Sequence, residues 1–188
     1  MSSRDQILAA IRQNRPETVP APILPEFGGD ASLEKFTTIL ESIGGRVVRL
    51  ESEAALPAYI KSEFPEFTRI ASPLFPASVA ITSDTPKPTL ETIELAVLKG
   101  DFGVAENGAI WVPEPAMLNR SLPFITQHLV LVIAESSLVP TMHVAYERIR
   151  HPGGYGVFIA GPSKTADIEQ SLVIGAHGAR TMTAVVVP

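Results

Sequence analysis

The strongest constraint on the fold is the apolar run over residues 129–134, which no charged side chain interrupts. A strand with one face in water alternates apolar and polar residues, whereas a continuous apolar run is typical of burial on both faces. The sequence then predicts a helix over 141–150, a strand over 157–160, a helix over 165–175 and a strand over 182–187. This alternation predicts an α/β fold with a mainly parallel sheet, flanked by helices and joined by right-handed crossovers.

Earlier segments predict further helices and strands. A helix over 32–43 would place Leu33, Phe36 and Leu40 on one face. Asn107 followed by Gly108 is a strong hairpin signal, because both central residues of a type I′ turn need a positive φ; a tight loop entering one strand would also explain it. The other expected elements are a helix over 54–64 and strands over 46–50, 68–72, 78–82, 94–99, 102–106 and 109–112.

The first 25 residues are expected to form an arm. The spacing of Ser3 and Gln6 matches a capping box and predicts a first helix. Four prolines between residues 14 and 25 then predict an extended linker, since proline fixes φ and removes a backbone donor. We therefore divide the chain into an N-terminal helix and linker, 1–25, and one α/β domain, 26–188. The arm either packs on its own domain or contacts another chain, including a second copy in a homo-oligomer.

Composition and charge exclude several classes of protein. The net charge of −5 disfavours nucleic acid as a partner, because binding it needs clustered Lys and Arg. Without cysteine the sequence offers no thiolate for an Fe–S cluster, and its histidines lack metal-site spacing, so we expect no cofactor and no metal. The apolar runs are far shorter than the ~20 residues of a membrane span. The N-terminus also lacks a secretory pattern, so we expect the cytoplasm.

The first candidate site runs from Gly161 to Asp167, where a buried strand is expected to turn into a helix. Ligands of open parallel sheets bind beyond the carboxyl ends of the strands. A helix N-terminus there would present unpaired N–H groups, while Ser163 and Thr165 add hydroxyls and Lys164 adds a positive charge. This pattern predicts a site for a phosphate or carboxylate. The alternative is that a hydroxyl caps the helix and Asp167 complements its dipole, with no ligand.

The second candidate site is the glycine-rich segment over 100–108, which follows a predicted buried strand. Glu106 could act as a nucleophile or general base, and Asp101 could bind a hydroxyl or an amine. The alternative is that Asp101 caps a turn and Glu106 is solvated. Distances between these groups and a ligand decide such roles.

Both segments resemble motifs of the LUD family. The C-terminal motif is GPSKTADIE at 161–169 followed by GAHG at 175–178, and the central motif is DFGVAENG at 101–108, where threonine often replaces Asn107. The likeness extends from about residue 30 to the C-terminus. It implies a fold similar to that of sugar isomerases and CoA transferases. It also implies a role in bacterial oxidation of L-lactate to pyruvate, alongside two Fe–S partner proteins.

Three functions fit these observations, and whether the chain is an enzyme stays open. The first is a subunit of a lactate-oxidising assembly that binds a small anionic ligand or holds a partner. The second is a free-standing enzyme of the CoA-transferase or phosphosugar type, with Glu106 as nucleophile or base and phosphate held over 163–167. The third is a protein in which both motifs only build the fold.

Overall fold

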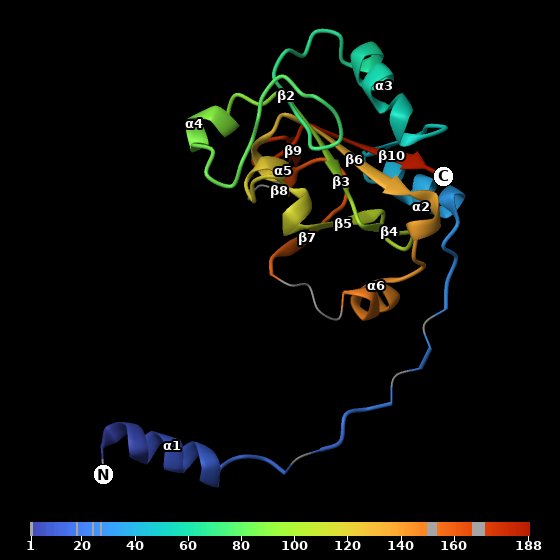
Figure 1. The fold of residues 1–188 in the computed structure, drawn as a ribbon. Helices are drawn as coiled ribbons and strands as arrows, with labels where there is room; N and C mark the ends of the chain where they lie inside the picture. Colours follow the sequence, from blue (N-terminus) through green and yellow to red (C-terminus); the bar gives the residue numbers. More distant parts are fainter. Residues whose placement is uncertain (1, 18, 24, 27, 150–153, 167–171) are drawn as a thin grey trace.

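The computed structural model describes residues 2–17, 19–23, 25–26, 28–149, 154–166 and 172–188 (Figure 1). Its central sheet has five strands in the order β1-β10-β6-β3-β2, and every neighbouring pair is parallel. The strands are β1 (Arg46–Arg49), β2 (Ile70–Ala71), β3 (Leu95–Lys99), β6 (His128–Ala134) and β10 (Thr181–Val187). The predicted α/β fold with a mainly parallel sheet flanked by helices is therefore confirmed.

The central strand β6 supplies side chains to a hydrophobic core on each face of the sheet. Leu131 and Ile133 belong to one core, and Val130 and Val132 belong to the other. This alternation explains the uninterrupted apolar run, because neither face of β6 meets water. Helices α2 (Leu33–Ser42) and α3 (Leu56–Glu63) contribute buried residues to the first and second core respectively, so they cover opposite faces.

A second sheet of three strands packs beside the first, with β4 (Phe102–Val104), β5 (Ala109–Pro113) and β7 (Gly156–Ile159) all antiparallel. The strand predicted at 157–160 therefore exists, but it pairs with β5 outside the parallel sheet. The short helical segments are η1 (Glu53–Ala55), α4 (Lys87–Leu90), η2 (Glu114–Ala116), α5 (Leu122–Ile125), η3 (Glu135–Ser137) and α6 (Met142–Arg148).

The helix predicted over 165–175 is wrong in the part that the structure describes. Strands β8 (Lys164–Ala166) and β9 (Leu172–Ile174) pair there in an antiparallel hairpin. Thr165 and its partner Val173 are β-branched, which favours a strand over a helix. Asp167, expected in the first turn of that helix, lies outside the described residues.

Two other local predictions need correction. Residues 78–82 form no strand, although the Val79 N–H donates to the Ile70 carbonyl at 3.0 Å. The hairpin between β4 and β5 is confirmed, but its turn is not type I′, because Gly108 has a positive φ of 70° and Asn107 does not. The Asn107 side chain instead accepts the Ala109 N–H at 3.0 Å, which closes the turn locally.

The N-terminal helix α1 (Ser3–Gln13) is present, buries none of its side chains and lies apart from the rest of the fold (Figure 1). Its cap is Ser2, not Ser3, in a reciprocal capping box with Asp5. The contact of this arm with another chain, and the division of the chain at residue 25, stay predictions. Among the residues that the structure describes, no helix combines the length and apolar character that crossing a bilayer requires.

Replacing Gly108 tests the packing of the β4–β5 turn on α2. A Cβ at this position would lie 2.9 Å from the Leu40 Cα, and the φ of 70° disfavours a side chain. We expect Gly108→Ala to lower the free energy of unfolding by about 2–4 kcal/mol, measured by chemical denaturation. Gly28→Ala is the matched control, since a Cβ there would meet nothing within 4 Å. Equal losses in the two variants would contradict this account of the turn.

Candidate functional site

Three depressions of the surface share lining residues, and the largest of them lies where the chain enters two strands of the central sheet. The largest has a volume of about 740 Å³ and includes Gln127 and Arg180, which directly precede β6 and β10. The second, of about 390 Å³, shares Arg120 with it, and the third, of about 240 Å³, shares Phe124 and His177. We call the largest the amino-edge groove; its charged and aromatic lining residues are Lys87, Glu91, Arg120, Phe124, Tyr155, His177 and Arg180.

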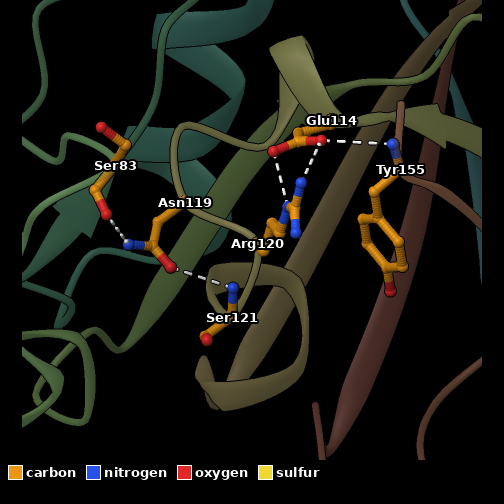
Figure 2. Close-up of polar contacts among 6 residues, drawn as sticks. All are labelled: Ser83, Glu114, Asn119, Arg120, Ser121 and Tyr155. Carbon is orange, nitrogen blue, oxygen red and sulfur yellow. Dashed lines mark hydrogen bonds and ion pairs between the residues drawn. The ribbon is translucent and has the colours of Figure 1, made fainter. Parts of the chain in front are cut away.

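Arg120 is held in place by Glu114, which follows β5. Its Nε and Nη2 donate to the two carboxylate oxygens of Glu114 at 2.6 and 2.8 Å, and the Tyr155 N–H donates to the same carboxylate at 3.2 Å (Figure 2). The guanidinium also lies 5.5 Å from the centre of the Tyr155 ring. The hydrogen bonds from Arg120 lower the pKa of Glu114, so this ion pair persists at neutral pH.

The loop that carries Arg120 is held through the side chain of its neighbour Asn119. Leu118 has a φ of 61°, a left-handed conformation that is strained for leucine. The Asn119 side chain donates to the Ser83 carbonyl at 3.0 Å and accepts the Ser121 N–H at 2.9 Å (Figure 2). These bonds hold the strained backbone and direct Arg120 toward the groove.

Arg180 brings a second guanidinium to the groove from the turn before β10. A Cβ on Gly175 would lie 2.5 Å from the Arg180 Cγ, so the glycine is what lets the arginine lie there. His128, the first residue of β6, is close enough to sense this charge. Burial, followed by the positive charge of Arg180, lowers the pKa of His128. The edge therefore combines a neutral imidazole with fixed positive charges at neutral pH.

Three of the five residues predicted to bind an anion line the smallest depression, and the helix N-terminus expected there is absent from the described residues, since Lys164–Ala166 form a strand. Gly161, Ser163 and Lys164 lie on its wall beside His177. The Lys164 ammonium donates to the Ile43 carbonyl at the C-terminal end of α2, and the Thr165 hydroxyl donates to the Val173 carbonyl at 3.3 Å. Both groups therefore have partners within the protein, and a cation suits a helix C-terminus.

Asp101 and Glu106 lie in other parts of the fold. Both side chains are exposed, and neither lines the three depressions. The Glu106 carboxylate accepts the Met142 N–H at 2.8 Å, in the first turn of α6. A carboxylate at that position satisfies a backbone donor that the helix leaves unpaired. The catalytic roles proposed for the two carboxylates stay predictions.

Sequence reasoning missed Arg120, Glu114, Tyr155 and Arg180. Residues 113–123 have the composition of a plain loop, and no motif marks them. The one usable signal was the presence of Arg120 in a proline-bounded loop of an acidic chain. Within the described ranges, no group of three or more His, Asp or Glu side chains could hold a metal ion.

The chain is similar to a known domain family and to several bacterial proteins. The family model of the LUD domain matches residues 33–187. Lactate utilization protein C of Shouchella clausii is 34% identical over 94 residues, which make up 47% of this chain and 41% of that protein. The protein of the same name in Anoxybacillus flavithermus is 33% identical over 99 residues, 52% of this chain and 45% of that protein. The matched segments thus span less than half of these relatives.

A solved structure shares the fold. It is a DUF162 family protein from Deinococcus radiodurans, with a TM-score of 0.63 at 19% sequence identity. The match covers 83% of this chain and 96% of that chain. At this identity the likeness supports the α/β architecture.

Replacing Glu106 tests its structural role. Glu106→Ala removes the acceptor for the Met142 N–H, and we expect the free energy of unfolding to fall by about 1–2 kcal/mol. Thermal or chemical denaturation measures the change. Glu66→Ala, at another exposed glutamate, is the control and should change the value by less than about 0.5 kcal/mol. An unchanged stability in Glu106→Ala would show that the carboxylate does not cap α6.

Proposed function

Because this chain belongs to the LUD domain family, we propose that it serves in bacterial utilisation of L-lactate, as a subunit that carries no redox cluster of its own. The observation that carries the proposal is the LUD domain match over residues 33–187, together with the relatives named lactate utilization protein C. The name that these relatives share refers to the use of lactate, and we extend that process to this chain. We also propose that the protein acts in the cytoplasm.

The proposal assigns the electron-transfer chemistry to Fe–S partner proteins. Oxidation of a 2-hydroxy acid to a 2-oxo acid releases two electrons, which need an acceptor. Iron–sulfur clusters are held by cysteine thiolates, and the sequence contains no cysteine. This chain would then bind, orient or regulate, while its partners carry the electrons.

The proposal also retains a small anion as the ligand of the segment from Gly161 to Thr165. In place of the expected helix N-terminus, the Ser163 hydroxyl and the His177 imidazole line the same depression of about 240 Å³. Hydroxyl and imidazole N–H groups both donate to carboxylates. The size of the depression suits a ligand as small as lactate or pyruvate.

Deleting the gene in its native cell tests the process. We expect growth on L-lactate to be lost or slowed and growth on pyruvate to be unchanged, because the missing step precedes pyruvate. The wild-type gene should restore growth on L-lactate, and a Ser163→Ala gene should restore it less well. Ser136→Ala is the matched control, an exposed serine of η3 at the opposite edge of the sheet. Equal impairment on both carbon sources would contradict the proposed role.

Purification of the tagged full chain from its native cell, without oxygen, tests the partners. We expect iron and acid-labile sulfide in the purified fraction, since any cluster found there must belong to another protein. A high-salt wash that removes the partner should remove the iron with it. If the chain elutes alone and free of iron from cells grown on L-lactate, the proposed partnership is wrong.

A further inference from the structure

We infer that the amino-edge groove binds a phosphate-bearing ligand with a planar ring, the chemistry of a nucleotide. This inference goes beyond the proposed function and does not depend on it. It rests on the charge of the groove, on a guanidinium that is already oriented, and on two exposed aromatic rings.

The groove is cationic although the chain as a whole is acidic. Lys87, Arg120 and Arg180 carry positive charges on three separate segments, in a chain with a net charge of −5. Glu91 is the one acid among the described lining residues, and it lies 3.9 Å from Lys87. Arg180 forms no ion pair within the described ranges. Glu91 offsets part of the charge of Lys87, and Glu114 offsets part of that of Arg120, so Arg180 carries the charge that no described acid pairs with. A cleft with a net positive charge concentrates anions, so the groove favours them.

Arg120 offers donors that the protein does not use. Glu114 occupies its Nε and one side of Nη2, and the Arg120 side chain is 64% exposed. The N–H groups on Nη1 and on the outer side of Nη2 have no partner in the described part of the chain. A planar guanidinium binds two oxygens of a phosphate or carboxylate at once. Since Glu114 already fixes its direction, binding costs little side-chain entropy.

The groove also presents two aromatic rings to solvent. Phe124 is 40% exposed and Tyr155 is 38% exposed, although rings of this size usually lie deeper. Both line the groove, and planar rings stack on such faces. A volume of about 740 Å³ falls within the range of ~300–1,000 Å³ for small-molecule sites, and exceeds what one small carboxylate fills. A ring joined to phosphate uses the charge and the aromatic faces together.

Titration calorimetry of the full chain with four probes tests the inference. The probes are ADP, adenosine, inorganic pyrophosphate and L-lactate. We expect ADP to bind more tightly than adenosine, which lacks the charge, and more tightly than pyrophosphate, which lacks the ring. Affinity for ADP should fall as salt rises, because exposed charges are screened. ADP binding no tighter than adenosine binding, or no binding of ADP, overturns the inference.

Variants of Arg120 test whether the phosphate of the ligand binds to this guanidinium. Arg120→Gln should weaken binding of ADP and of pyrophosphate by roughly 10- to 100-fold, through the loss of charged hydrogen bonds. The control is Arg49→Gln, since Arg49 is 63% exposed and pairs with Glu135 at 2.8 Å at the opposite edge of the sheet. If Arg120→Gln does not fold, Arg120→Lys keeps the charge, loses the fork and should still weaken binding. Equal losses in the Arg49 and Arg120 variants overturn the assignment.

A variant of Tyr155 tests whether the planar ring of the ligand stacks on this side chain. Tyr155→Leu removes the aromatic face and leaves the backbone N–H that donates to Glu114. We expect weaker ADP binding and unchanged pyrophosphate binding, with thermal unfolding confirming that the variant folds. A parallel loss for both probes would show that Tyr155 acts through Arg120 and would remove the ring from the inference.

Discussion

Burial of β6 on both faces is the constraint from which the rest of the structure follows. Each fully buried Val or Leu contributes about 1.5–3 kcal/mol, and successive residues of β6 supply a core on either side of the sheet. Both faces must then be covered, and α2 and α3 cover them. Parallel partners on both sides, β3 and β10, satisfy its backbone groups. Because all these strands run the same way, their amino ends meet at one edge.

The amino edge is where separate parts of the chain converge. Arg180 lies at this edge directly before β10, and Gln127 lies there directly before β6. Glu114 reaches it from the end of β5 and holds Arg120, which connects the antiparallel sheet to this edge. The resulting cluster of positive charge requires support, because like charges repel. Ion pairs with Glu114 and Glu91 supply part of that support.

The proposed function names a cellular process, whereas the further inference names the chemistry of a ligand. The proposed role in lactate utilisation rests on the family match and the relatives' names, whereas the inferred ligand rests on the residues that line the groove. The small depression at Ser163 and the larger groove share Phe124 and His177, so two ligands bound there would be neighbours. In the proposed role, the chain, which has no cysteine, would hold anions while the proposed partners carry the electrons.

The sequence could predict those elements whose pattern reflects burial. Strands β6 and β10 have uninterrupted apolar runs, and α2 has one apolar face. Such patterns predict the element and its burial, because the spacing of apolar residues depends on which faces meet water. In the described part of 165–175 the predicted helix is wrong, because Lys164–Ala166 and Leu172–Ile174 pair as antiparallel strands. The helical interpretation gave too little weight to the β-branched Thr165 and Val173, which favour a strand. The position of β7 in the second sheet depends on its pairing with β5, more than 40 residues earlier in the chain, and no local pattern reports such a pairing.

For the site, the sequence by itself determined an anion-binding hypothesis and the family motifs at 101–108 and 161–178, because these are contiguous in the chain. Only the tertiary structure decided that Glu106 binds α6 and that Lys164 binds the end of α2. It also brought together Arg120 and Arg180, which are distant in sequence. The physical reason is that a charge acts through space, and the chain's folded path sets which charges are near one another.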